Sequence, residues 1–437
     1  MVYDIIIGRN KEDQKKFQDK GVIYIGKGYV QMGNYISLSN RIYLDIIRSH
    51  VILIAGKRGS GKSYSIGVLA EEISDLPENI KENIAPIIFD TMGIFWTMKY
   101  KNEREIELLD EWNLKPRNLP VTIWVPSGYF EEYEKKEIPV DKKFAIAATE
   151  LEIEDWIKIF NLKMIDSISI FIQKIISELK EKESFDLDDI IEKIKKQNVS
   201  DSKIKESALA LFEAAKSWKV FAKKNEPSTK INELINRGKT TVLDLSIYPS
   251  NSTFNIRALL IGIISKKIFE ERMIERKKEE IESIQYGIDY NVKQKKELPL
   301  VWIFIDEAHE FLPINKKTPA TDSLVQILRE GRQPGISLIL ATQQPGIIHR
   351  DVMTQSDIIL SHKLTNKKDL EALNEIMQSY FLESIQKTMN SLPKQKGAAI
   401  ILDDNSERLY TVKIRPRFTW HGGETPTAIK IKENILR

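Results

Sequence analysis

Short apolar runs separated by glycine, asparagine and charged residues recur along the whole chain. Within residues 1–48 the runs YDIII, VIYIG and YISL alternate with turn residues, which predicts a small β-rich region. The next run, VILIAG at 51–56, is continuously apolar, as expected of a strand buried on both faces of a parallel sheet. The pattern therefore predicts a change of architecture near residue 49.

Residues 49–437 continue with strand-like runs that are separated by stretches of helical spacing. These runs are PIIFD, VTIWV, TTVLDL, LVWIFID, ISLILAT and DIILS. Strands that alternate with helices favour an α/β domain built on a central, mostly parallel sheet. We therefore expect one large α/β domain over residues 49–437.

Three segments depart from this alternation. From about 147 to 234 no strand-like run occurs, and DSISIFIQKIISELKEKE has helical spacing, so we expect a helical insertion there. A long helix is predicted from about Phe254 to Ile284, apolar in its first half and charged in its second. At about 396–437, GAAIILDD and LYTVKIRP predict a hairpin, which the irregular tail RPRFTWHGGETP follows.

The composition of the 437-residue chain is that of a globular protein, with 42% hydrophobic and 30% charged residues. A net charge of +3 means that any nucleic-acid site must be a local patch. The lack of cysteine excludes disulfides and thiolate metal sites and fits a reducing compartment. The longest apolar run, Ala258–Ile264, is too short to span a bilayer, so we expect a cytoplasmic protein without membrane contact.

A glycine-rich turn follows the first continuously apolar run and precedes a helical pattern. Its sequence, GKRGSGKS, fits G-x-x-x-x-G-K-[ST], in which glycines let backbone N–H groups converge on phosphate oxygens. Lys62 supplies positive charge, and the Ser63 hydroxyl is placed to ligate Mg²⁺. The predicted nucleotide-binding residues are Gly56, Lys57, Arg58, Gly59, Ser60, Gly61, Lys62, Ser63 and Tyr64. We therefore expect a nucleoside triphosphate site rather than a plain glycine-rich turn.

Two adjacent carboxylates, Asp306 and Glu307, end the strand-like run LVWIFID. In enzymes with such a phosphate loop, a carboxylate at this place completes the Mg²⁺ coordination begun by Ser63, so Ser63 and Asp306 are the predicted metal residues. Glu307 is then placed to orient or deprotonate the attacking water, which favours an ATPase over a slow signalling switch. The alternative is a pair of solvent-facing acids at the end of a strand.

An amide follows the next strand-like run, ISLILAT. Gln343 can bond both the γ-phosphate and the attacking water, although an amide that caps a loop is the alternative. The stretch DEAH also contains His309, which we interpret as a structural residue on the following turn, because no second RecA-like domain with an arginine-rich motif is found.

The set of motifs resembles the HerA–FtsK class of ring-forming, DNA-translocating ATPases, and most closely its HerA-like branch. The matching pieces are GKRGSGKSYS, FDTMGIFW, IFIDEAHEFLP, LREGRQPGISLILATQQP and RPRFTWHGG. They cover most of the chain from Val51 to Gly423 apart from the helical insertion. The segment from Asp306 to Pro345 is the most specific, because the order and spacing of its three elements agree with the family.

This resemblance implies a RecA-like P-loop core with ATP and Mg²⁺ as cofactors. It also implies a homo-oligomer, expected to be a hexamer, around duplex DNA without sequence specificity, and a NurA-type nuclease partner in the processing of DNA ends. The family has a longer N-terminal β-barrel, so residues 1–48 are expected to form a reduced barrel.

The resemblance also assigns roles to single residues. Lys62, Glu307 and Gln343 match catalytic positions, and Arg329 and Arg332 match the family's arginines near the γ-phosphate, some of which come from the adjacent subunit. Arg48 is another candidate for an arginine that acts between subunits. The alternative for Arg329 and Arg332 is a salt bridge within the chain, to Glu307 or Glu330.

Two lysine-bearing loops are candidates for non-specific contact with the DNA backbone. They lie before and after the acid pair and contain Lys293, Lys295, Lys296, Lys316 and Lys317. The alternative for both is a solvated loop. Three other functions stay open: a motor that acts on polypeptide, a defence-system ATPase with a separate effector, and a signalling switch.

Overall fold

The computed structural model describes residues 3–32, 35–181, 184–198, 201–250, 252–286, 298–376, 384–393 and 395–423. Thirteen strands in this part of the chain form one sheet, in the order β1-β3-β2-β13-β12-β11-β4-β10-β9-β5-β8-β6-β7. Their bounds are β1 Ile5–Ile7, β2 Val22–Met32, β3 Tyr35–Asp45, β4 Val51–Ala55, β5 Ile84–Asp90, β6 Val121–Pro126, β7 Lys142–Phe144, β8 Thr240–Asp244, β9 Leu300–Ile305, β10 Ile336–Thr342, β11 Ile358–His362, β12 Ala398–Asp403 and β13 Arg408–Ile414. The predicted α/β fold with a mostly parallel central sheet is confirmed.

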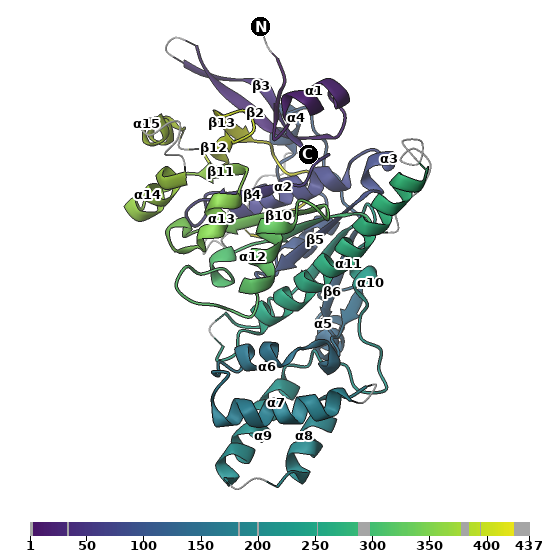
Figure 1. The fold of residues 1–437 in the computed structure, drawn as a ribbon. Coiled ribbons are helices and arrows are strands. Elements are labelled where there is room, and N and C mark those ends of the chain that lie inside the picture. The colour runs from purple at the N-terminus through teal and green to yellow at the C-terminus, as the bar shows by residue number, and fades with distance from the viewer. Residues whose placement is uncertain are drawn as a thin grey trace.

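The α-helices occupy both faces and one end of this sheet (Figure 1). Their bounds are α1 Lys11–Phe17, α2 Lys62–Ser74, α3 Glu78–Lys81, α4 Ile106–Glu111, α5 Phe130–Lys135, α6 Ile153–Ile159, α7 Ser167–Lys180, α8 Leu187–Lys196, α9 Ser202–Ser217, α10 Ile231–Leu234, α11 Ile256–Tyr286, α12 Thr321–Glu330, α13 Arg350–Gln355, α14 Lys367–Ile376 and α15 Ser384–Ser391. Among the described residues, no helix is both long and apolar enough to cross a membrane.

The central strands run parallel, so their carboxyl ends share one edge of the sheet. In β4 and β10, Ala55 lies opposite Thr342, and β10 is paired in parallel with β9. The loops that follow β4, β9 and β10 therefore emerge together, which is the edge where ligands bind in open α/β sheets. On the other side of β4, antiparallel pairing of β11, β12, β13, β2 and β3 extends the sheet.

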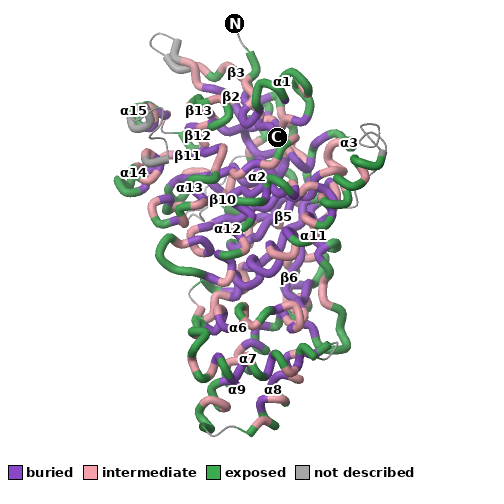
Figure 2. The backbone as a smooth tube through the Cα atoms, viewed as in Figure 1, coloured by how far each residue is buried: buried purple, intermediate pink, exposed green. Residues whose placement is uncertain are grey.

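The residues of the central strands are buried along the length of each strand, as Figure 2 shows. Leu53 packs with α11 and α12 in one core, whereas the next residue, Ile54, packs with α2 in a second core on the opposite face. Alternate side chains of a strand point to opposite faces, so a strand covered on both sides must be apolar throughout. This is why the central strands were visible as continuous apolar runs.

The described residues of the region from about 147 to 234 contain helices α6 to α10, and the region extends beyond β6 and α5 (Figure 1). Its core is aromatic: the ring of Trp156 lies 5.0 Å from that of Phe212 and 5.7 Å from that of Phe160. The prediction of helices here agrees with α6, α7, α8, α9 and α10. The division of the chain into an N-terminal region and an ATPase domain with an insertion stays a prediction.

The pattern of apolar residues did not predict some of the short elements. Strand β7 has three residues, of which Lys142 and Lys143 are exposed, so no apolar run marks it. Helix α1 has seven residues, and Asp13 is the only one of them that is buried. Strands β1, β2 and β3 join the edge of the main sheet through the pairing of β2 with β13.

Candidate functional site

The loop between β4 and α2 has the backbone geometry of a phosphate cradle. Gly59 and Gly61 have φ values of +74° and +114°, in the region that favours glycine. A Cβ atom added to Gly59 would meet no atom within 4 Å, so the space above the loop is open. The N–H groups of Gly59 and Gly61 donate to no acceptor in the described part of the chain. Backbone N–H groups that are left without an acceptor just before a helix N-terminus suit an anion such as a triphosphate.

Lys62, Ser63 and Asp306 converge beside this loop. The Ser63 hydroxyl donates to Asp306 Oδ2 at 2.5 Å, and the Asp306 side chain is buried. Burial lowers the pKa of Lys62, while the nearby Glu307 and Asp306 carboxylates oppose that shift. Burial raises the pKa of Asp306, against the effect of the Ser63 hydrogen bond. A hydroxyl and a buried carboxylate within hydrogen-bond distance are hard oxygen ligands, so these residues fit Mg²⁺.

Glu307 follows Asp306 in an unusual backbone conformation, with φ 52° and ψ 42°. Its Oε1 accepts a hydrogen bond from Gln343 Nε2, which brings the ends of β9 and β10 together. Its Oε2 is buried and has no hydrogen-bond partner among the described residues. Left-handed backbone at a non-glycine residue is strained and is concentrated at functional sites. The predicted water-activating carboxylate is thus held with one oxygen free.

His309 lies beside this pair and contacts the end of β10. Its Nδ1 is 3.2 Å from Thr342 Oγ1 and 3.6 Å from Glu307 Oε2. Burial and the nearby Lys62 lower the pKa of His309, which favours the neutral ring. These contacts hold the turn after β9 against β10, which fits the structural role predicted for His309.

A second histidine, which sequence reasoning missed, lies beneath the phosphate loop. His362 ends β11, and its Nδ1 donates to the Ala398 carbonyl at 3.2 Å, so its Nε2 accepts from the Ser65 hydroxyl at 2.9 Å. Burial lowers the pKa of His362 to about 4, so the ring stays neutral. The available signal was a polar residue at the end of the run DIILSH, directly after an apolar strand.

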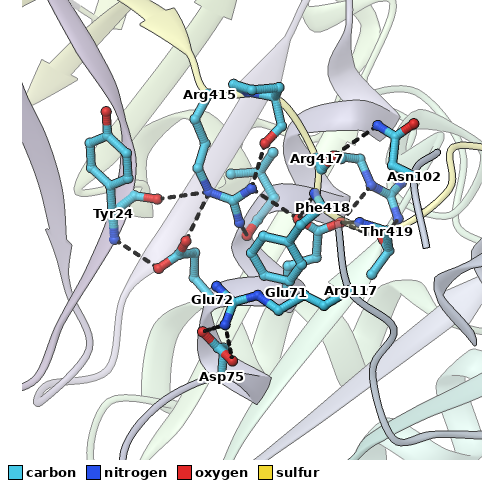
Figure 3. A network of polar contacts seen from close by, with 12 residues as sticks. Tyr24, Glu71, Glu72, Asp75, Asn102, Arg117, Arg415, Arg417, Phe418 and Thr419 are labelled. Carbon is cyan, nitrogen blue, oxygen red and sulfur yellow. Dashed lines mark hydrogen bonds and ion pairs between the residues drawn. The ribbon is translucent and has the colours of Figure 1, made fainter. Parts of the chain in front are cut away.

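The C-terminal tail crosses the helix that carries Lys62 and Ser63. We call residues 415–421 the strap (Figure 3). The fully buried carboxylate of Glu71 accepts hydrogen bonds from Arg415 Nη1 and Arg417 Nε, both at 3.0 Å, and from the backbone and hydroxyl of Thr419. Gly67 must be a glycine, because an added Cβ would lie 2.4 Å from Arg417 Nη1.

The strap also reaches the first turn of α2. The Tyr64 hydroxyl accepts from the Arg417 N–H at 2.6 Å and donates to Glu105 Oε2 at 3.1 Å. The His421 ring contacts the Tyr64 ring edge-on, with centroids 5.2 Å apart. The predicted nucleotide-binding residue Tyr64 therefore contacts the strap. The sequence analysis identified the irregular tail RPRFTWHGGETP but did not predict that it binds Glu71.

The two arginines of the LREGRQPG stretch lie at the other end of β10 from Gln343. Arg329 donates to Asp351 Oδ2 at 2.7 Å, so it forms the salt bridge within the chain that was its alternative role, but its partner is Asp351 and not Glu307 or Glu330. Arg332 is exposed and forms no hydrogen bond or ion pair with the described residues. Because β10 has seven residues, roughly 23 Å of strand separates Arg332 from Gln343 of the same chain.

Arg48, the third candidate arginine, makes two hydrogen bonds to the carboxylate of Asp13 in the N-terminal region, at 3.0 and 2.9 Å. Its side chain remains about half exposed. Arg48 precedes β4, so it too lies at the edge of the sheet away from the phosphate loop.

The loop after the acid pair is joined to the loop after Gln343. Ile314 N donates to Ile347 O at 2.9 Å, and His349 N donates to Leu312 O at 2.6 Å. Lys316 and Lys317 lie exposed on this loop, and Lys317 forms an ion pair with Asp322 at 2.9 Å. The other predicted DNA-contact residues, Lys293, Lys295 and Lys296, lie outside the described residues.

The sequence of this chain matches a known protein family and is similar to a curated protein. Residues 30–268 match the family described as "Helicase HerA, central domain". The DNA double-strand break repair helicase HerA of Saccharolobus solfataricus is 24% identical over 388 residues, which cover 87% of this chain and 67% of the relative.

Two solved structures share the fold at low sequence identity. VirB4 of Thermoanaerobacter pseudethanolicus gives a TM-score of 0.55 at 12% identity, covering 92% of this chain and 98% of that one. The bacterial conjugative coupling protein TrwB gives a TM-score of 0.51 at 10% identity, covering 86% and 87%. These likenesses concern the fold alone.

Proposed function

Because this chain belongs to the HerA helicase family and is a P-loop ATPase, we propose that it couples Mg²⁺-dependent ATP hydrolysis to movement along duplex DNA. One observation carries the catalytic part of the proposal. The open phosphate loop, the Ser63–Asp306 pair and the Glu307–Gln343 pair emerge together at the carboxyl edge of three neighbouring strands.

Each group has a task in phosphoryl transfer. The N–H groups of the loop and Lys62 would hold the triphosphate, and Ser63 and Asp306 would hold the metal. Bound Mg²⁺ would neutralise charge on the β- and γ-phosphates. The free Oε2 of Glu307 accepts a proton from the water that attacks the γ-phosphorus, while the bond to the β-phosphate oxygen breaks and ADP leaves. Gln343 holds the other oxygen of Glu307 and so links water activation to the end of β10.

An arginine from a neighbouring subunit completes the site in this proposal. Arg332 lies far from the phosphate loop of its own chain, and its exposed side chain, which has no partner in the described part of the chain, is open to another subunit. Positive charge near the γ-phosphate stabilises the charge that develops during transfer. A closed homo-oligomer, which we propose to be a hexamer, would bring such an arginine to every site.

Duplex DNA is the proposed track. The loop 313–319 carries the exposed Lys316 and contains no aromatic residue, so it suits phosphate contact rather than grip on a polypeptide. Its hydrogen bonds to residues 347–349 connect it to the strand that carries Gln343. Residues on both sides of the site can thus transmit the state of the γ-phosphate to this loop. A NurA-type nuclease partner is part of the same proposal.

The test is steady-state ATP hydrolysis with and without linear duplex DNA, at low and high protein concentration. We expect stimulation by duplex that grows with protein concentration, because the site is shared between subunits. Lys62→Ala is the control for contaminating activity, since removing the loop lysine abolishes triphosphate binding. Hydrolysis that is indifferent to DNA and to protein concentration would refute a DNA motor with shared sites.

A further inference from the structure

The turn at residues 331–335 joins α12 to β10 and carries Arg332, whose action between subunits is part of the proposed function on which this inference rests. Backbone hydrogen bonding closes the turn, because Ile336 N donates to Gly331 O at 2.8 Å. Within the turn Arg332 is exposed, whereas Pro334 is buried. The exposed arginine is therefore carried by backbone that is anchored in the molecule.

A buried guanidinium from another element contacts this turn. Arg272, on α11, is fully buried. Its Nε donates to the Pro334 carbonyl at 2.8 Å, and its Nη1 donates to the Leu298 carbonyl at 2.8 Å. Its Nη2 lies 3.4 Å from Glu279 Oε1 on the same helix. Since Pro334 and Leu298 precede β10 and β9, one guanidinium joins α11 to the starts of both strands.

Gly335, the last residue of the turn, fits closely against the start of β9. Its φ is +81°, and an added Cβ would lie 2.4 Å from Leu300 Cδ2 and 3.4 Å from Arg272 Nη2. Its carbonyl accepts a hydrogen bond from Val301 N at 3.2 Å. The turn is thus held by its own backbone, by β9 and by α11, while the side chain of Arg332 has no partner in the described part of the chain.

Packing alone gives no reason for an arginine at position 272. Removing a charge from water is costly, and an apolar side chain of similar volume often fills such a place with equal or greater stability. A planar guanidinium can hold two carbonyls at once in a fixed geometry, which neither an apolar side chain nor a lysine can do. Precise support matters for a group that stabilises a transition state, because a misplacement of about 1 Å can lower the rate about a hundredfold.

We infer that Arg272 is a positioning residue, which holds the Pro334 carbonyl and so places Arg332 for the nucleotide site of the neighbouring subunit. The competing interpretation is that Arg272 only stabilises the packing of α11 on the sheet. The two interpretations differ in the subunit that is affected. A misplaced Arg332 impairs the neighbour's site and leaves the nucleotide site of its own subunit intact.

ATP hydrolysis by mixed full-length variants separates the two interpretations. Arg272→Lys keeps the charge but cannot hold both carbonyls, so we expect hydrolysis to fall about 10- to 100-fold while ATP affinity is unchanged. Mixed with Glu307→Gln, it should regain activity, because its intact Glu307 meets a well-placed Arg332 of the other variant. Mixed with Arg332→Ala, it should regain none, because both variants then lack a working Arg332.

Arg276→Lys, one turn further along α11, is the matched control and should retain the parent rate. Arg276 is partly exposed and pairs with Glu279 at 3.2 Å and with Glu280 at 3.0 Å. Gly335→Ala displaces the same turn without removing a buried charge, so it should show the same complementation pattern even if Arg272→Lys does not fold.

The parent rate in Arg272→Lys would overturn the inference. Gain of activity on mixing Arg272→Lys with Arg332→Ala would also overturn it, as would no gain on mixing it with Glu307→Gln. If Arg332→Ala and Glu307→Gln do not complement each other, the shared site of the proposed function fails, and the inference fails with it.

Discussion

At the scale of single residues, Glu307 shows how a local strain is maintained by its surroundings. Its left-handed backbone is unfavourable for a residue with a side chain, by about 1–3 kcal/mol. The hydrogen bond from Gln343 and the buried Asp306 beside it hold the conformation. The result is a carboxylate with one oxygen fixed by Gln343 and the other without a hydrogen bond from the described residues.

Glu307→Gln should separate nucleotide binding from hydrolysis. The amide keeps the size of the side chain but cannot accept a proton from water, so turnover should fall about 10²- to 10⁴-fold. Binding of ATP, measured by fluorescence of a labelled analogue, should change little. Glu330→Gln, which removes an exposed carboxylate near Arg332, is the control and should retain hydrolysis. If the Glu307→Gln variant retained hydrolysis, Glu307 would not be the residue that activates the attacking water.

His50 predicts a pH dependence of stability away from the nucleotide site. It is buried between Asp357 at 2.6 Å and Asp45 at 3.3 Å, whose carboxylates raise its pKa to about 9 against the opposing effect of burial. The folded pKa lies above the unfolded value of about 6.5, so the stabilisation is complete below pH 6.5 and is lost as pH rises through 9.

The urea midpoint of unfolding should therefore decrease between about pH 6.5 and pH 9, by the equivalent of roughly 1–3 kcal/mol. The His50→Gln variant should show a flatter profile over the same range. A parent midpoint that stays constant or rises there would contradict the ion-paired histidine.

At the scale of elements, helix α2 connects the phosphate loop to the strap at residues 415–421. Its N-terminal turn carries Lys62 and Ser63, and two turns later Glu71 binds the strap. Two buried guanidinium groups share this carboxylate, and Arg415 also pairs with Glu72 at 2.8 Å. Such a network is costly to break from one side, because the remaining charges stay buried.

Glu71→Gln should lower the free energy of unfolding by about 3–5 kcal/mol, since the amide keeps the shape but leaves the buried Arg417 without a carboxylate partner among the described residues and leaves Arg415 with Glu72 alone. Equilibrium denaturation in urea measures this change. Glu131→Gln is the control: this exposed residue faces Lys135 at 4.0 Å, and its loss should change stability by less than about 0.5 kcal/mol. Similar midpoints for both variants would show that the strap contributes little to stability.

At the scale of the whole molecule, the placement of Arg332 predicts complementation between subunits. Arg332→Ala keeps a complete Glu307 but lacks the arginine, whereas Glu307→Gln has the opposite defect. In a ring of randomly mixed subunits, about a quarter of the sites would join an intact Glu307 to a neighbour's Arg332.

An equimolar mixture should therefore hydrolyse ATP faster than the sum of the separate variants, at up to about a quarter of the parent rate. Mixing Arg332→Ala with Lys62→Ala tests the same geometry with a different inactive partner. If the rates of ATP hydrolysis were only additive in both mixtures, Arg332 would not act on the site of a neighbouring subunit.

The sequence by itself determined the elements whose signals are local. A strand buried on both faces must be apolar throughout, so β4, β5, β9 and β10 were predictable, as was the α/β class. The phosphate loop and the acid pair could also be recognised from the sequence, because each is a short contiguous motif. The roles of the individual site residues stay predictions.

Only the tertiary structure decided which distant groups meet. Glu71 contacts Arg415 across 344 positions, and Ser65 contacts His362 across 297, separations over which periodicity carries no information. The pairing of Arg329 with Asp351 rather than Glu307 follows from strand direction, which puts the start and end of β10 at opposite edges of the sheet. Local pattern specifies elements, but strand order and direction specify which of their ends are neighbours, and the site is built from those ends.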